Sequence, residues 1–134
     1  KSGTVFISVK NEDKENIILM TQILIKLNFK IVATMGTANY LRKFSISSKM
    51  VNKVTEGHPH IVDKIENKEI DLIINTTQDS QSLKDSHSIR RSAIKYQIPY
   101  VTTISAAKLA ISGINVMLNQ EMRVNSLQEF YKDN

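Results

Sequence analysis

The run Asp71-Leu72-Ile73-Ile74-Asn75-Thr76-Thr77 is nearly continuous in apolar residues until its last three positions. A short apolar run of this length, bounded by polar residues, predicts a β-strand over 71–75. The three hydrogen-bonding residues that close it, Asn75, Thr76 and Thr77, suit either a turn or contacts with a ligand.

Short apolar runs before and after this strand alternate with helix-like stretches. We expect strands over 4–9, 29–33, 50–54, 71–75 and 99–102, and helices over 13–27, 37–44, 60–68, 86–96 and 105–114. Asp13, Ser86 and Ser105 are the expected N-caps of three of these helices. The alternation implies βαβ units, a parallel sheet and helices on both of its faces. We therefore predict a three-layer α/β/α sandwich with a five-stranded parallel sheet; residues 121–134 either pack back or lead out of it.

The composition indicates a single soluble domain over residues 1–134, with 41% hydrophobic and 23% charged residues. No apolar run approaches the ~20 residues that cross a bilayer, so we expect no membrane partner. The absence of cysteine excludes disulfides and thiolate metal sites and fits a cytoplasmic protein. Because the chain begins at Lys1 and not at Met, we expect a piece of a longer chain.

The net charge of +5 raises the possibility of an anionic partner. The lysines are scattered along the chain, however, and there is no Trp, whereas nucleic-acid binders typically cluster basic residues with exposed aromatic ones. We expect no nucleic acid. A small phosphorylated ligand needs only one or two well-placed cations.

Two residues at the end of the first strand point to such a ligand. Ser8 lies near that end, and Lys14 follows in the first turn of the next helix. A lysine there runs against the helix dipole, which favours anions by ~0.3–1 kcal/mol. A bound phosphate would reconcile the two, although a solvated surface lysine is the plainer alternative.

The second strand ends in Ala33-Thr34-Met35-Gly36-Thr37, which leads straight into a helix. Gly36 permits a close backbone approach, Thr34 and Thr37 supply hydroxyls, and the first helical N–H groups lack intrahelical partners. Gly and Thr are also common at ordinary turns, so this motif alone is weak. Lys53, in the predicted third strand, would bring a second cation to the same rim. Together these groups suit a phosphomonoester dianion.

Other polar residues fit a site less well. His58 and His60 flank Pro59 without the ligand set that zinc requires, so we interpret them as loop and cap residues. No paired carboxylates suggest general acid–base catalysis. We therefore expect no metal site and no catalytic residues.

Seven segments then match a known family in order and spacing: Gly3 to Val9, Asp13-Lys14, Ala33 to Thr37, Val51 to Val54, Glu56 to Ile61, Ile73 to Thr77 and Ile89 to Ala93. Over nearly the whole chain the sequence resembles the C-terminal regulatory domain of bacterial carbamoyl-phosphate synthetase large chains. The resemblance implies a fold like that of methylglyoxal synthase and a site where the inhibitor UMP and the activator IMP overlap.

The resemblance also assigns residues. The nucleotide phosphate would meet Lys14, Thr34, Gly36, Thr37 and Lys53, and the rest of the pocket would hold Ser8, Asn75, Thr76 and Thr77. Tyr100 and Thr102 match the family's contacts for the activator ornithine. The match to the ornithine contacts is incomplete, because Pro99 stands where some relatives have His.

The resemblance implies that the parent chain is an ATP-dependent ligase. It would use Mg²⁺ and K⁺, work with a glutaminase small chain, and supply carbamoyl phosphate for pyrimidine and arginine synthesis. Its active sites would lie outside this sequence, so we expect no cofactor and no catalysis here. Methylglyoxal synthase itself is the main alternative, but two of its catalytic aspartates align with His58 and Asn75, and only Asp85 is kept. A protein-interaction module without a ligand is the third possibility.

Overall fold

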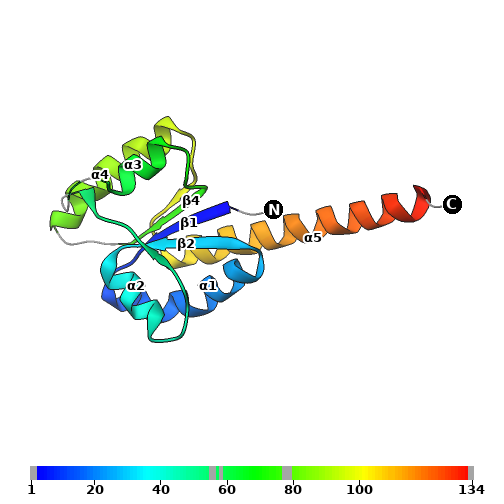
Figure 1. Cartoon of the computed structure of the whole chain (residues 1–134), viewed down its shortest axis with the longest axis horizontal. Helices are drawn as coiled ribbons and strands as arrows, with labels where there is room; N and C mark the ends of the chain where they lie inside the picture. Colours follow the sequence, from blue (N-terminus) through cyan, green and yellow to red (C-terminus); the bar gives the residue numbers. More distant parts are fainter. Residues whose placement is uncertain (1–2, 55–56, 58, 77–79, 133–134) are drawn as a thin grey trace.

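Five strands form one parallel sheet in the order β3-β2-β1-β4-β5 (Figure 1). The computed structural model describes residues 3–54, 57, 59–76 and 80–132, with the backbone alone for 80–84 and 122–132. The elements along the chain are β1 (Gly3–Ser8), the 3-10 helix η1 (Asn11–Asn16), α1 (Ile17–Lys26), β2 (Phe29–Ala33), α2 (Met35–Arg42), β3 (Lys49–Met50), α3 (Ile61–Glu66), β4 (Leu72–Asn75), α4 (Ser80–Lys95), β5 (Tyr100–Val101) and α5 (Ile104–Lys132).

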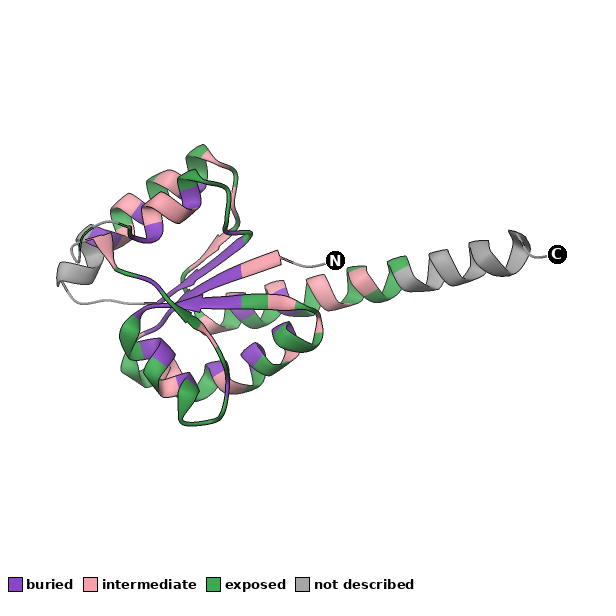
Figure 2. Cartoon of the chain, in the orientation of Figure 1, coloured by how far each residue is buried: buried purple, intermediate pink, exposed green. Residues whose placement is uncertain are grey.

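Helices cover both faces of this sheet, because successive strand side chains point to opposite sides. In β1, Val5 and Ile7 pack into a cluster with residues of α1, α2 and α5, while Phe6 packs into a second cluster with residues of α3 and α4. Figure 2 shows the central strands β1 and β4 as mostly buried, with burial patterns that contrast with the exposed edge strand β3. The predicted three-layer α/β/α sandwich with a five-stranded parallel sheet is confirmed.

The third strand was placed wrongly. The prediction was 50–54, but β3 pairs with β2 only over Lys49–Met50. After Val51 N donates to the Ala33 carbonyl (2.9 Å), the chain leaves β2, and Asn52 forms an isolated bridge to His60 instead. Lys53 therefore lies beyond the strand and not within it.

All three predicted N-caps were wrong. Asp13 lies inside η1, because the chain already turns at Lys10, whose carbonyl accepts from Asp13 N (3.0 Å). Ser86 lies in the interior of α4, since that helix begins at Ser80. For α5 the cap is Thr103, whose Oγ1 accepts from Ala106 N at 3.1 Å, and Ser105 is already helical.

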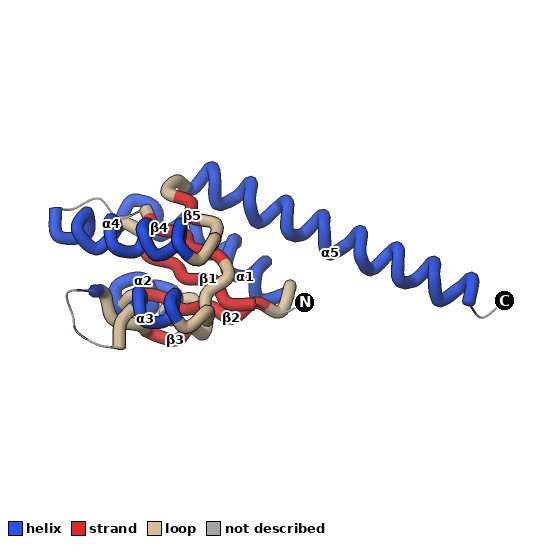
Figure 3. Tube along the Cα trace, turned by 90° about the horizontal axis from the view of Figure 1, so that it is seen from above, coloured by secondary structure: helices blue, strands red, loops and turns tan. Residues whose placement is uncertain are grey.

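The last helix is longer than the predicted 105–114. It continues to Lys132 as one helix of 29 residues and takes up most of 121–134. Figures 1 and 3 show its second half extending away from the sandwich. In the part of the chain that the structure describes, no helix is both long and apolar enough to span a membrane.

Candidate functional site

The strand order reverses between β1 and β4, and both strands end at the same edge of the sheet. Ser8 is the register partner of Asn75, so the last residues of the two strands lie side by side. Parallel sheets bind ligands outside the carboxyl ends of their strands at such a reversal. We therefore describe the candidate site as this edge together with the residues that follow β1 and β2, and Thr76 after β4.

Lys14 reaches from η1 to the first turn of α2. A Cβ built on Gly36 would lie 3.4 Å from Lys14 Nζ, an ordinary van der Waals distance, so the two residues are direct neighbours. Lys14 Nζ also donates to Asn11 Oδ1 at 2.7 Å, which fixes its direction. The structure thus brings Lys14 and Gly36 together at the N-terminus of an eight-residue helix.

Buried hydroxyl groups join α2 to β1. Thr37 Oγ1 accepts from Val9 N at 3.2 Å, and Thr34 Oγ1 donates to Ser8 Oγ at 3.2 Å. Thr34 occupies the N-cap position of α2, but its side chain makes no hydrogen bond to the helix. Ser8, Thr34 and Thr37 are buried, so their hydroxyls have structural roles whether or not a ligand binds.

The end of β4 is tied to three other elements. Thr76 Oγ1 accepts from Lys10 N at 3.1 Å, and Thr76 N donates to the Ser8 carbonyl at 2.9 Å. Asn75 Nδ2 donates to Ser86 Oγ (2.9 Å) in α4 and to Tyr100 OH (3.0 Å) in β5. Tyr100, expected on the ornithine side, is therefore in direct contact with a residue expected in the nucleotide pocket.

Thr102 is exposed just after β5. Thr77 lies outside the described residues, as does His58.

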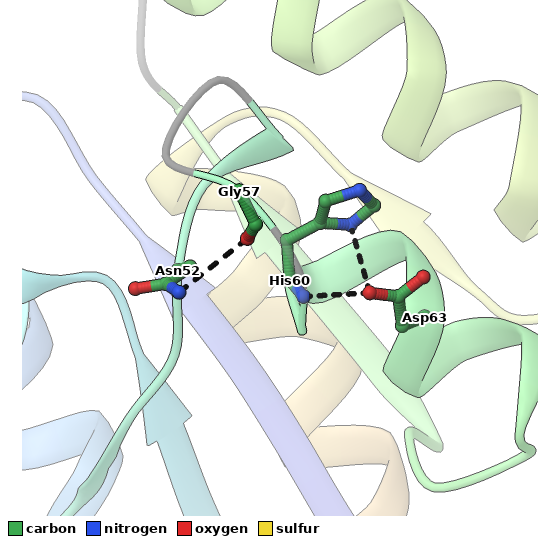
Figure 4. A network of polar contacts seen from close by, with 4 residues as sticks. All are labelled: Asn52, Gly57, His60 and Asp63. Atoms are coloured by element: carbon green, nitrogen blue, oxygen red, sulfur yellow. Dashed lines mark hydrogen bonds and ion pairs between the residues drawn. The ribbon is translucent and has the colours of Figure 1, made fainter.

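Lys53 belongs to a separate segment, the one that leads from β3 to α3. Figure 4 shows polar contacts of its neighbours Asn52 and His60 in this segment. The Asn52 carbonyl accepts from Ile61 N at 3.0 Å, and Asn52 Nδ2 donates to the Gly57 carbonyl at 3.4 Å. His60 is the N-cap residue of α3, as its interpretation as a cap predicted, and its N–H donates to Asp63 Oδ2 at 2.8 Å. Lys53 is half-buried in this segment, whereas Lys14 Nζ lies beside Gly36 of α2.

Three residues of the site escaped the sequence reasoning. Asn11, which orients Lys14, stands three positions before it, a spacing at which helical neighbours touch. Ser86 was interpreted as the N-cap of a helix, so the sequence did not predict its hydrogen bond with Asn75. Lys10 contributes its backbone N–H, for which the sequence offers no signal.

No group of three His, Asp or Glu side chains that could hold a metal ion occurs among the described residues. The chemistry present at the edge is instead an ammonium group, several hydroxyls, an amide and a helix N-terminus. Those are donors for an anion.

The architecture and this edge define a methylglyoxal-synthase-like α/β domain. Residues 16–102 match the family described as "MGS-like domain", and the chain belongs to this family.

The chain's relatives include carbamoyl phosphate synthase large chains. The C-terminal section of the Methanopyrus kandleri large chain is 44% identical over 131 residues, covering 97% of this chain and 24% of that relative. The large chain of Buchnera aphidicola is 46% identical over 132 residues, which cover 98% of this chain and 12% of that relative. That of Myxococcus xanthus is 45% identical over 130 residues, covering 97% and 12%. The chain thus spans a quarter or less of the length of these relatives.

Solved structures support the fold. Methylglyoxal synthase from Elizabethkingia anophelis NUHP1 superposes with a TM-score of 0.64 at 14% identity, over 84% of this chain and 77% of that one. ForH superposes with a TM-score of 0.59 at 15% identity, over 84% and 79%. The expected fold like that of methylglyoxal synthase is confirmed.

Proposed function

We propose that this chain is the allosteric regulatory domain of a glutamine-hydrolysing carbamoyl-phosphate synthase large chain, and that it binds nucleoside monophosphates. UMP would act as the inhibitor and IMP as the activator at one overlapping site, with ornithine as a further candidate near Tyr100 and Thr102. The observation that carries the proposal is the approach of Lys14 Nζ to Gly36 at the N-terminus of α2, beside the strand reversal.

A phosphomonoester fits this place on physical grounds. The helix N-terminus carries partial positive charge and N–H groups without intrahelical partners, and the ammonium group adds a full charge. Lys53 and Thr77 would complete the pocket from the neighbouring segments. Contacts to the phosphate would supply most of the affinity, and contacts to the base would supply most of the discrimination between UMP and IMP.

The relatives suggest the enzyme to which this domain would belong. In such a large chain the catalytic sites, with their ATP, Mg²⁺ and K⁺, would lie outside this region, and so would the contacts with the glutaminase small chain. We place the protein in the cytoplasm, with its product feeding pyrimidine and arginine synthesis. A bound nucleotide can shift the enzyme only by its differential affinity for two states, typically ~1–3 kcal/mol of coupling.

A thermal-shift comparison tests the binding. A ligand at about 100 times its dissociation constant stabilises the fold by roughly 2.7 kcal/mol, so UMP and IMP should each raise the melting temperature. Inorganic phosphate at the same concentration serves as the control and should do little. If neither nucleotide shifts the transition, the chain is better described as a protein-interaction module.

The likeness to methylglyoxal synthase makes an elimination reaction the second candidate. It is the weaker one, since Asn75 stands where a carboxylate base is expected and its amide donates to Ser86 and Tyr100. An amide cannot replace a carboxylate base. Incubation of the chain with dihydroxyacetone phosphate should therefore yield no methylglyoxal above background. Clear turnover would make methylglyoxal synthesis the favoured function.

A further inference from the structure

Helices α1 and α5 cover the same face of the sandwich (Figures 1 and 3), and residues of both line a groove of about 480 Å³. Its lining is mainly apolar and comes from both helices, with one charged residue from each side. The residues that matter for its chemistry are Leu19, Met20, Ile23, Ile111, Glu15 and Lys108.

Both helices also carry exposed apolar side chains. Leu19 is 68% exposed at the wall of the groove, although its neighbour Met20 is buried. On α5, Leu109 and Val116 stand three residues before and four residues after Ser112, which lines the groove, so all three share one helical face. Leu109 is 75% exposed and Val116 53% exposed. Large apolar side chains exposed beside a groove are candidates for contact with a partner.

The two sides of the groove carry opposite charges. Glu15 approaches it from η1 and Lys108 from α5, and neither forms an ion pair with another described residue. An occupant that suits both would present an apolar stripe flanked by a basic group on the η1 side and an acidic group on the α5 side. An amphipathic helix laid between two helices has this form.

The groove is also connected to the candidate nucleotide site. Glu15 follows Lys14 directly in η1, so one short 3-10 helix carries the ammonium group at Gly36 on one side and a wall of the groove on the other. A partner seated against Glu15 and Leu19 would therefore contact the element whose position sets Lys14. Coupling between two sites requires such a shared element.

We propose that the α1/α5 groove docks an amphipathic helix from the remainder of the large chain and that this contact transmits nucleotide occupancy. The inference rests on the proposed function. The relatives support this occupant, because in the large chains the matched region is 12% of the length and must contact the rest of the chain to regulate it.

The test compares two substitutions of equal chemistry on opposite faces. Leu19→Glu introduces a charge into the groove wall, and Ile94→Glu introduces one at a residue of α4 that is 69% exposed. Both residues are solvent-exposed in this chain, so neither change should unfold it. Each variant is made in this chain, for UMP titration, and in the intact large chain, for UMP inhibition of carbamoyl phosphate synthesis.

Leu19→Glu should leave UMP affinity in this chain unchanged but abolish most of the inhibition in the intact enzyme, where coupling is typically ~5–150-fold. Ile94→Glu should change neither. Unaltered inhibition in the intact Leu19→Glu enzyme overturns the groove as the route. Sedimentation of this chain gives a second way to overturn the proposal. If the unmodified chain is a dimer and Leu19→Glu makes it a monomer, the groove binds a second copy and not a helix of the large chain. If the unmodified chain fails to bind UMP, the proposed function fails instead.

Discussion

At the scale of single residues, the candidate site depends on the approach of one lysine to a helix N-terminus. Lys14 Nζ lies at the first turn of α2, 3.4 Å from the position that a Cβ on Gly36 would take. Asn11 holds the ammonium group in that direction. The positive end of the helix and the lysine charge would repel each other in the absence of an anion, and an anion between them would relieve the repulsion.

Lys53 provides the residue-scale prediction. Lys53→Ala should weaken UMP binding about ten- to a hundredfold, because it removes a charge-assisted contact worth ~1.5–3 kcal/mol. Isothermal titration calorimetry measures the change. Lys26→Ala is the matched control: it removes the same charge from the exposed far end of α1, and salt screens exposed charges beyond about 8 Å. Unchanged affinity in Lys53→Ala would remove Lys53 from the site.

Residue types at the strand ends could be predicted from the sequence, but their partners could not. Thr37 and Val9 are hydrogen-bonded across 28 residues, and Asn75 and Tyr100 across 25. Such pairs depend on which strands become neighbours, which a local pattern does not contain. The contact between Asn75 and Tyr100 joins two groups of residues that the family resemblance had assigned to different ligands.

At the scale of elements, three helices are followed, two positions past their last residue, by a residue with left-handed backbone; a fourth such residue, Ser45, lies three positions past the end of α2. Asn28 follows α1 with φ 69°, Lys68 follows α3 with φ 59°, and Gln97 follows α4 with φ 58°. Glycine is the usual residue at this position, because other side chains crowd the next carbonyl group. Of the three, Asn tolerates the conformation best.

Replacing these residues by glycine should therefore have unequal effects. In Lys68→Gly the relief of ~1–2 kcal/mol of left-handed strain exceeds the ~0.5–1 kcal/mol entropy cost of glycine, so the free energy of unfolding should rise by about 0.5–1 kcal/mol. In Asn28→Gly the free energy of unfolding should rise only slightly, because Asn already tolerates the left-handed conformation. Urea denaturation of both variants makes the comparison, and a loss of stability in Lys68→Gly would contradict it.

Regular elements followed from the sequence where hydrophobic pattern alone determines them, as for β2, predicted and found at Phe29–Ala33. The failures occur where tertiary contacts override local signals. β3 stops after two residues because Asn52 pairs with His60. The start of α4 was missed because its first residues are polar and carry no helical hydrophobic period.

At the scale of the whole molecule, the reversal of strand order creates the only place where the ends of β1 and β4 meet side by side within the described sheet. Val9 and Lys10, which follow β1, are hydrogen-bonded there to Thr37 and Thr76, and α5 begins after β5. From that beginning α5 crosses the sandwich, packs through Ala107 and Ile111, and then leaves it.

The course of α5 predicts where the folded unit ends. Val116 and Met117 are already more than half exposed, and Figure 1 shows the following turns extending away from the sheet. Removing residues 122–134 should therefore change the free energy of unfolding by less than about 0.5 kcal/mol, as for changes at exposed positions. Ile111→Ala, in the same helix but buried, should cost ~2–5 kcal/mol. Urea unfolding of the two variants beside the unmodified chain measures the contrast. A truncation as costly as Ile111→Ala would mean that these turns pack against a second copy in solution, which sedimentation would detect as a dimer that the truncation dissociates.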